Sequence, residues 1–240
     1  MGSKRLIAAF FSVCAAWTVH AAVLIDSSVA GTALTLPVPA GFTEPSNDVP
    51  ILRSRAEQIT PPQMRLLATY VDDPDLLAVQ QGTTPNFRRY FMISVLRSKE
   101  ADVLDVKAFR SVKSEVIGLD QAATDRAREG VQRHLDSAAR RVGVESGVSE
   151  LSLKVGESRQ LGVFDETATS ISMLAVSKVS ASNGTRELNT TVGQATSLVL
   201  LNGKVVFLAV YARIDIDDDY LWLREQSESW IKSALQSNPK

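Results

Sequence analysis

Reactive side chains are scarce in this 240-residue sequence, which contains one cysteine, Cys14, and two histidines, His20 and His134. We expect Cys14 and His20 to be removed with an N-terminal leader. The mature chain would then have no thiol nucleophile, no disulfide and no cysteine metal site. His134 alone cannot complete a zinc site of protein nitrogen and sulfur ligands. We therefore interpret His134 as part of a solvated helix face.

Familiar motifs of catalysis and cofactor binding are also missing. The sequence has no Gly-x-x-x-x-Gly-Lys or Gly-x-Gly-x-x-Gly loop for phosphate groups and no Gly-x-Ser-x-Gly nucleophile elbow. We predict no cofactor and assign no catalytic residue. Pairs of carboxylates remain open, because 27 acidic residues allow many pairings and sequence gives no distances between them.

Charge of one sign is not in excess. The 26 basic and 27 acidic residues give a formal net charge of −1. A chain without a strongly basic surface lacks the electrostatic footprint of a nucleic-acid-binding protein, so we predict no nucleic-acid partner. Hydrophobic residues make up 45% of the chain, enough for one sizeable core.

The N-terminus has the pattern of a signal peptide. Lys4 and Arg5 precede an apolar run over residues 6–17, and small residues follow at a cleavage position after Ala21 or Ala22. We therefore expect a periplasmic or secreted protein that is not an integral membrane protein after cleavage.

Two alternatives concern the same segment. A membrane anchor would need a run of roughly 20 apolar residues, longer than this one. A bacterial lipoprotein would carry its lipid on Cys14, but Val13 stands where a small residue normally precedes the cysteine. No other stretch of the sequence is long and apolar enough to span a bilayer.

The C-terminal third gives the clearest structural signal. Two β-rich runs, residues 195–201 and 204–213, are joined by Asn202-Gly203. Asn-Gly between such runs predicts a hairpin with a type I′ turn, in which both central residues have positive φ. An acidic stretch then leads into an amphipathic helix over residues 220–235.

Upstream patterns predict more sheet and helix. We expect a polar lead (26–31) and strands near 33–36, 63–71 and 86–97. We also expect a helix over 51–58, capped by Asp48 and with Pro50 in its first turn. Residues 72–81 are expected to form a helix or a loop. After residue 149 we expect a meander of strands at 151–155, 159–164 and 170–179, a turn-rich break at 180–184 and a lead at 188–193 into the hairpin.

A long helical arm separates these two parts. Apolar residues recur every three or four positions from Phe109 to Val142, as on one buried helix face. Asp105 caps the start of this arm, residues 105–142. Gly118 is a candidate break with Asp120 capping a second helix, so one helix and two helices both remain open. The predicted fold class is α+β: a single domain, residues 26–240, with helices packed on an antiparallel sheet.

The stretch Leu34-Thr-Leu-Pro-Val-Pro-Ala-Gly-Phe42 resembles the opening of PsbP-like extracytoplasmic domains. Trp222, Trp230 and Ser233-Ala-Leu235 are similar to the tryptophan-containing last helix of those domains. The resemblance implies an antiparallel sheet with packed helices that ends in strand–strand–helix. It also implies a binding or assembly accessory without catalytic residues. The long arm departs from the compact members.

The acidic stretch offers the best candidate for a metal site. Asp215, Asp217 and Asp219 have the 1-3-5 spacing of a calcium loop. The sixth position, however, is Tyr220 instead of glycine, and the twelfth is Gln226 instead of Glu. The alternative, which we favour, is capping: these carboxylates satisfy free N–H groups and oppose the helix macrodipole.

Two further groups have a structural and a functional interpretation. In Arg88-Arg89-Tyr90-Phe91, strand alternation places Arg88 with Tyr90 on one face and Arg89 with Phe91 on the other. We interpret this stretch as an amphipathic strand instead of a nucleic-acid surface. Trp222 and Trp230, eight residues apart near one helix face, are interpreted as core anchors.

The leading functional hypothesis is a non-catalytic, exported binding or accessory module with a protein or small-molecule partner. One alternative is a hydrolase that uses carboxylates, with a divalent ion at Asp215–Asp219. Another is an interaction protein whose arm, residues 105–142, docks a partner.

Overall fold

The computed structural model describes residues 23–118, 121–146 and 150–239. The predicted leader and Asp120 lie outside these residues. In chain order the elements are β1 (Leu24–Val29), β2 (Thr32–Pro37), β3 (Phe42–Thr43), α1 (Pro50–Ile59), β4 (Met64–Asp72), α2 (Asp73–Gln80), β5 (Arg89–Leu96), η1 (Arg97–Lys99), α3 (Val106–Ile117), α4 (Gln121–Ser146), β6 (Ser152–Glu166), β7 (Ser170–Ser182), β8 (Glu187–Leu201), β9 (Lys204–Arg213) and α5 (Asp218–Ser237).

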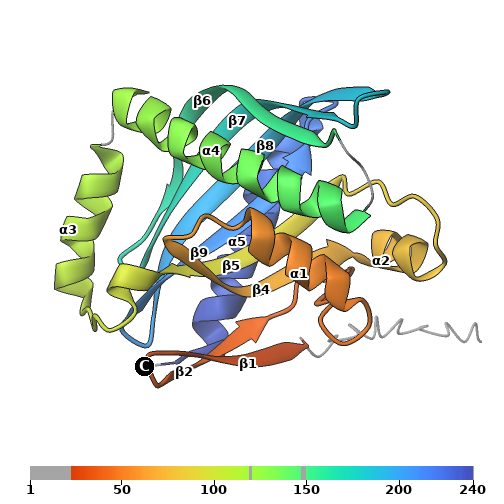
Figure 1. The fold of residues 1–240 in the computed structure, drawn as a ribbon. Coiled ribbons are helices and arrows are strands. Elements are labelled where there is room, and N and C mark those ends of the chain that lie inside the picture. Colours follow the sequence, from red (N-terminus) through yellow and green to blue (C-terminus); the bar gives the residue numbers. More distant parts are fainter. Residues whose placement is uncertain (1–22, 119–120, 147–149, 240) are drawn as a thin grey trace, which may run out of the picture.

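An antiparallel sheet of seven strands, in the order β3-β4-β5-β9-β8-β7-β6, forms the centre of the molecule (Figure 1). Helix α5 and the separate hairpin β1–β2 cover one face of this sheet. Helices α1, α3 and α4 lie over the other face. The predicted α+β class with an antiparallel sheet is confirmed.

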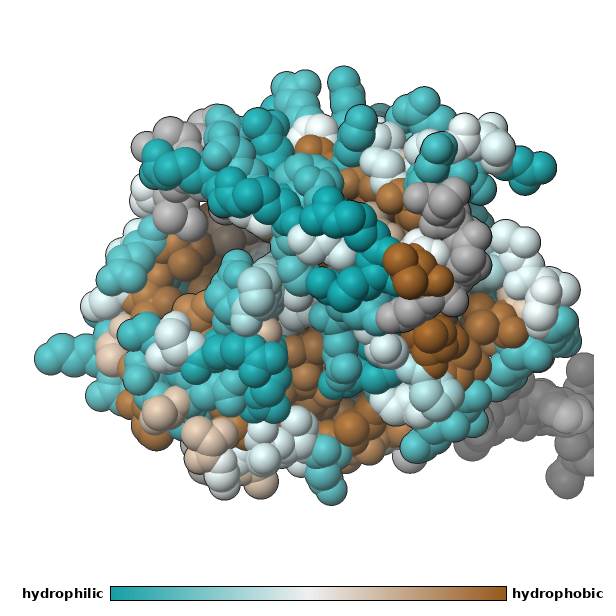
Figure 2. All heavy atoms as spheres, viewed as in Figure 1, coloured by the Kyte–Doolittle hydropathy of each residue, from teal (hydrophilic) through white to brown (hydrophobic). Residues whose placement is uncertain are grey.

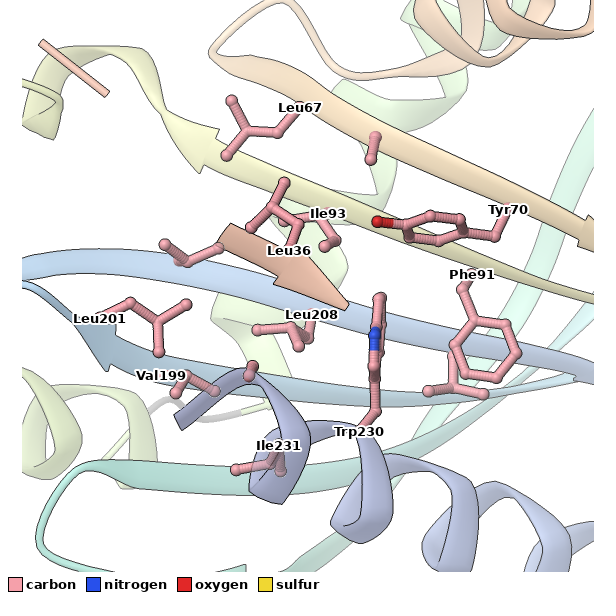
Figure 3. Packing of buried hydrophobic residues seen from close by; sticks show 14 of the residues in the cluster. Leu36, Leu67, Tyr70, Phe91, Ile93, Val199, Leu201, Leu208, Trp230 and Ile231 are labelled. Atoms are coloured by element: carbon pink, nitrogen blue, oxygen red, sulfur yellow. The ribbon is translucent and has the colours of Figure 1, made fainter. Parts of the chain in front are cut away.

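The larger core lies between the sheet and α5, and Trp230 is at its centre (Figure 3). The Trp230 ring packs edge-on against Phe91 and Tyr70, with centroid distances of 4.9 and 5.8 Å. Its indole N–H donates to the Pro37 carbonyl oxygen at 2.8 Å, so one side chain joins α5 to both β2 and the sheet. The prediction that Trp230 anchors the core is confirmed.

A smaller core on the opposite face surrounds Phe109 of α3, which is fully buried. Phe109 packs with Leu198 and Leu200, whereas Val199 and Leu201 of the same strand belong to the larger core. The end of β8, residues 198–201, is thus buried on both faces, which explains why its sequence is continuously apolar. Figure 2 shows hydrophobic residues gathered beside α3, below α4, where the smaller core reaches the surface.

Helix α4 covers part of the β6 edge. The Gln132 side-chain amide donates to the Leu153 carbonyl oxygen at 2.9 Å and accepts from the Val155 N–H at 2.8 Å. The Gln132 amide thus binds the β6 backbone as a neighbouring strand would. It covers unpaired N–H and C=O groups to which a strand of another chain could otherwise add. No helix among residues 23–118, 121–146 and 150–239 has the length and apolar character needed to cross a membrane.

Several predicted boundaries were wrong. The polar lead is strand β1, closed onto β2 by a turn in which Ala30 and Gly31 have φ of 45° and 81°. Asp48 does not cap α1: Val49 is the N-cap residue and Pro50 is the first helical residue. The predicted break at 180–184 is too early, because β7 continues to Ser182.

The predicted arm consists of two helices, α3 and α4, which run in different directions over the sheet (Figure 1). Asp105 caps α3 as predicted, with its carboxylate 2.7 Å from the Ala108 N–H, and Gly118 follows the last residue of that helix. The hairpin prediction is also confirmed: Asn202 and Gly203 have φ of 48° and 82°. Strand β9 has the predicted bounds, but β8 begins eight residues before the predicted start at Ala195.

Candidate functional site

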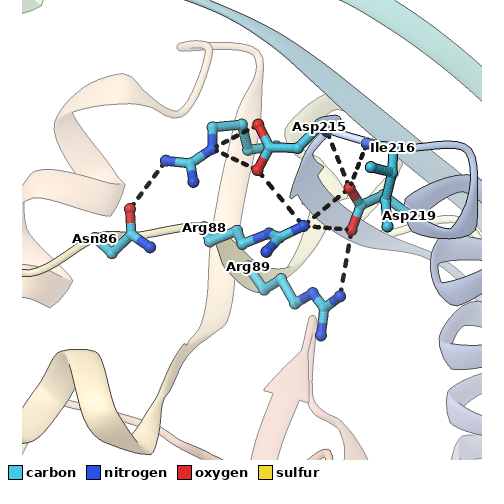
Figure 4. A network of polar contacts seen from close by, with 7 residues as sticks. Asn86, Arg88, Arg89, Asp215, Ile216 and Asp219 are labelled. Atoms are coloured by element: carbon cyan, nitrogen blue, oxygen red, sulfur yellow. Dashed lines mark hydrogen bonds and ion pairs between the residues drawn. The ribbon is translucent and has the colours of Figure 1, made fainter.

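A polar network joins the start of α5 to the loop before β5, and Asp219 is at its centre (Figure 4). The Asp219 carboxylate accepts from the Arg88 guanidinium at 2.9 and 3.0 Å and from Arg89 at 3.3 Å. It also accepts from the backbone N–H groups of Asp215 and Ile216, at 3.0 and 3.2 Å. The carboxylate is therefore surrounded by donors although Asp219 is only 2% exposed.

Two opposing effects act on the pKa of Asp219. Burial alone would raise it, because desolvation disfavours the charged form. The hydrogen bonds from the Asp215 and Ile216 N–H groups and from Arg88 outweigh burial and lower the pKa to about 2. Asp219 is thus a permanently charged structural carboxylate at neutral pH.

The network extends outward from Asp219. Arg213 bonds the Asp215 carboxylate at 3.1 Å and the Asn86 side-chain oxygen at 2.9 Å. The Arg89 guanidinium lies 4.2 Å from the centroid of the Trp222 ring, a cation–π contact. These contacts hold the segment between β9 and α5 in one position.

The predicted alternation of the two arginines was wrong, since Arg88 and Arg89 both bind Asp219. Strand β5 begins only at Arg89, and Phe87 has a φ of 45°. The left-handed backbone conformation of Phe87 turns the chain immediately before Arg88. Arg88 therefore does not follow the alternation of side chains along the strand. From Tyr90 onward the alternation holds: Tyr90 stacks on Tyr211 at 4.5 Å.

The three metal candidates have different surroundings. Asp219 binds both arginines, and Asp215 binds Arg213. Asp217 is exposed and is the N-cap residue of α5, without a side-chain capping bond. Among the residues that the structure describes, no three Asp, Glu, His or Cys side chains are grouped as metal ligands. The calcium hypothesis remains a prediction. The favoured alternative, side-chain capping of the helix, was wrong: α5 has no side-chain capping bond, and the two N–H groups bound by Asp219 belong to Asp215 and Ile216, which precede the helix.

A groove of about 580 Å³ lies next to this network, on the α5 face of β6, β7 and β8. The register in which β6, β7 and β8 pair explains which side chains line the groove. Lys154 on β6 pairs with Ser180 on β7, which pairs with Asn189 on β8. In the adjacent same-face row, Lys178 pairs with Thr191. The groove is lined by Lys154, Gly156, Lys178, Val179, Ser180, Asn189, Thr190, Thr191, Ile214 and Asp215.

One wall of the groove is the segment after β9. The Ile214 N–H donates to the Thr191 carbonyl oxygen at 2.8 Å, which holds this segment over β8. Asp215, the one acidic side chain among the lining residues, is bound by Arg213 and lies 3.5 Å from Arg88. The polar network therefore fixes the groove wall. Its arginines, Arg213 and Arg88, pair with the Asp215 carboxylate in that wall.

A second cavity, of about 480 Å³, lies between the C-terminal half of α5 and the β6–β7 turn. Asp165 and Glu228 both line it, together with the apolar Ile231 and Leu235. With two carboxylates in its lining, this cavity is a candidate location for a carboxylate-based mechanism.

Sequence reasoning missed two groups of buried polar residues. The hydroxyls of Ser172, Ser197 and Ser227 form a buried chain with O–O distances of 2.9 Å. These serines bind each other, and no described histidine bonds them. Lys113 and Lys204 are also buried: Lys113 binds Glu166, and Lys204 donates to two loop carbonyl oxygens. No local signal identifies such residues, because their partners are distant in the sequence.

His134 is half-buried, not solvated as predicted. Its Nε2 atom is buried and has no hydrogen-bond partner among the described residues. No second histidine or cysteine lies in the described part of the chain, so His134 has no partner for a zinc site there.

No protein-family model matches the sequence, and no curated protein matches it. Among solved structures, the chain is similar to the Ran-binding protein Mog1p of Saccharomyces cerevisiae, with 12% identity over 91% of this chain and 93% of that chain and a TM-score of 0.30. A point mutant of protein Mog1 gives 13% identity over 90% and 93%, also at 0.30.

Proposed function

We propose that this chain is a non-catalytic, exported binding module whose ligand occupies the groove on β6, β7 and β8. The observation that carries the proposal is the chemistry of the groove lining. It offers ammonium, hydroxyl and amide groups, and its one carboxylate, Asp215, is already bound by Arg213. Such groups recognise a ligand through hydrogen bonds and charge, but they include no free acid–base pair and no activated nucleophile.

The shape of the groove supports the same proposal. Its volume of about 580 Å³ is that of a small-molecule site. Its floor is the ladder of the three paired strands β6, β7 and β8. Rigid β-strands hold recognition groups more accurately than a loop does.

Thermal unfolding with a panel of small molecules tests the binding proposal. Glucose, glucose 6-phosphate, glutamate and spermidine represent neutral, anionic, zwitterionic and cationic ligands. At least one should raise the Tm of the wild type, because a ligand that binds only the folded state stabilises it. The groove-filling variants Ser180→Phe and Gly156→Leu should lose this rise. A panel without any stabilising compound would contradict the proposal.

The location of the protein is a separate part of the proposal, supported by Lys4, Arg5, the apolar run 6–17 and the small residues at Ala21 and Ala22. N-terminal sequencing of the protein recovered from the periplasm or medium of an expressing bacterium should give Ala22 or Val23 as the first residue. An uncleaved protein in the cytoplasmic fraction would contradict export.

Kinship with PsbP-like extracytoplasmic domains remains part of the proposal, supported by the opening stretch 34–42 and the closing strand–strand–helix unit. It adds no catalytic residue to the chain.

The second candidate function is a carboxylate-based hydrolase, and the observation that favours it is that Asp165 and Glu228 line one cavity. Assays with chromogenic glycosides and esters test it. Turnover that is abolished in both Asp165→Asn and Glu228→Gln, and retained in Ser180→Phe, would replace the binding module by an enzyme.

A further inference from the structure

Two lysines lie close together on the groove floor. Lys154 is directly opposite Ser180, and Lys178 is two residues before Ser180 on β7. Residues two apart on a strand share a face, so Lys154 and Lys178 are diagonal neighbours on adjacent antiparallel strands, a spacing of about 7–8 Å between Cα atoms. Long side chains at that spacing reach a common point above the sheet.

Within the part of the chain that the structure describes, neither ammonium group has a counter-charge. The side chains of Lys154 and Lys178 form no ion pair and no hydrogen bond with another described residue. The acidic side chain in the wall, Asp215, binds Arg213. Glu187, one row further along β8, accepts from the Asn189 amide at 3.3 Å. Two like charges without a counter-charge repel each other on a sheet, and an anion between them would remove that repulsion.

Neutral polar groups surround the two lysines. The hydroxyls of Ser180 and Thr191 line the groove and form no hydrogen bond with a described residue, so both can donate to or accept from a ligand. Gly156 presents no side chain, which leaves space directly beside Lys178; a Cβ there would lie 3.4 Å from the Lys178 carbonyl oxygen. A bare phosphate ion would occupy only part of a volume of about 580 Å³.

We propose that this groove binds a small polyhydroxylated anion, a sugar phosphate or sugar acid, whose anionic group bridges the ammonium groups of Lys154 and Lys178. The hydroxyls of the ligand bond Ser180 and Thr191. This inference rests on the proposed function, since it names the ligand class of the same groove. The two sources of anionic charge, phosphate and carboxylate, are distinguished by the test.

Isothermal titration calorimetry with glucose 6-phosphate, glucuronate and glucose tests the ligand class. At least one of the two anions should bind at low ionic strength at least about tenfold more tightly than glucose, because charge-assisted hydrogen bonds are roughly twice as strong as neutral ones. Affinity should fall when sodium chloride is raised to about 0.3 M, where the Debye length is shorter than about 8 Å. Tighter binding of the phosphate or of the carboxylate identifies the anionic group.

Lysine variants locate the anion. Lys154→Gln and Lys178→Gln should each weaken binding of the anion about tenfold, and the double variant should reduce it to the affinity for glucose. Lys107→Gln, an exposed lysine on α3, is the matched control and should leave affinity unchanged within about twofold. Circular dichroism of each variant verifies folding.

The outcomes separate this inference from the proposed function. If glucose or spermidine stabilises the wild type and not Ser180→Phe, while neither anion binds more tightly than glucose, the groove binds a ligand but the anion inference is wrong. Equal weakening by Lys107→Gln would show non-specific charge attraction and would also overturn it. No binding by any of the probes contradicts both proposals.

Discussion

The carboxylate of Asp219 and the guanidinium of Arg88 lie 2.9 Å apart and join segments that are 131 residues apart in the chain. Asp219 is 2% exposed, whereas the Arg88 side chain is 35% exposed. Removing the Asp219 carboxylate would leave Arg89 and two backbone N–H groups without this acceptor, and Arg88 with only Asp215, 3.5 Å away. This ion pair holds the start of α5, and with it the wall of the groove.

Stability should therefore depend on pH in the acid range. The pKa of Asp219 is about 2 in the folded state and roughly 3.9 in an unfolded chain. Because the folded pKa is lower, the contribution is fully present above about pH 5 and is lost as pH falls through about 2; its size is about 2–3 kcal/mol. Asp219→Asn should flatten the pH dependence of urea unfolding in this window. Asp218→Asn, an exposed neighbour, should not.

The tryptophans of α5 should differ in their effect on stability. Trp230→Ala should lower the free energy of unfolding by about 3–5 kcal/mol, because it empties the centre of the larger core and removes the bond to Pro37. Trp222→Ala should cost less, since Trp222 is half-exposed. Urea denaturation of both variants measures the difference. Equal losses would contradict the assignment of Trp230 as the main anchor.

Tyrosine ionisation should destabilise the fold at alkaline pH. Burial raises the pKa of Tyr211 to about 12, above the value of about 10 for an unfolded chain. This contribution is present below pH 10 and is lost as pH rises from about 10 to about 12, because the unfolded state loses its phenol proton first. Absorbance at 295 nm, compared between wild type and Tyr211→Phe, reports the titration. A Tyr211 midpoint near pH 10 would show that the ring is solvated.

Calcium should not stabilise the protein. Asp215 and Asp219 already bind arginines, so an ion at this stretch would have to displace them. We expect an unchanged Tm with a few millimolar calcium or magnesium chloride. A rise that disappears in Asp217→Asn would instead establish the site suggested by the sequence, since selective binding to the folded state raises Tm.

Local signals predicted the parts of the fold that depend on local conformation. Asn202-Gly203 specified its own turn, and β9 followed with the predicted bounds. Ala30-Gly31 gives a much weaker turn signal, so the hairpin β1–β2 was missed. Its strand β1 is also polar, with Asp26 and Ser28 in it.

Gly193 shows why β8 was predicted too short. A glycine reads as a break in a strand, but here it is buried beneath α5. A Cβ at this position would lie 2.6 Å from a Leu223 methyl carbon and 2.7 Å from one of Ile214. The glycine is needed for close packing between elements, and that packing is not visible in local sequence.

The candidate site could not be predicted for the same reason. Lys154 and Lys178 become neighbours only through the pairing of β6 with β7, and Thr191 joins them only through the pairing with β8. The metal candidates Asp215 and Asp219 are only four residues apart in the sequence and were therefore conspicuous. Their arginine partner Arg88 comes from the opposite half of the chain.

Chemical-shift mapping by NMR tests the central claim most directly. Titrating ¹⁵N-labelled protein with glucose 6-phosphate and with glucuronate should shift the amide signals of Lys154, Lys178, Ser180 and Thr191 in a saturable manner, with no ligand turnover. Saturable shifts at Asp165 and Glu228 with release of product, or no saturable shift anywhere, would contradict a binding module with its ligand on β6, β7 and β8.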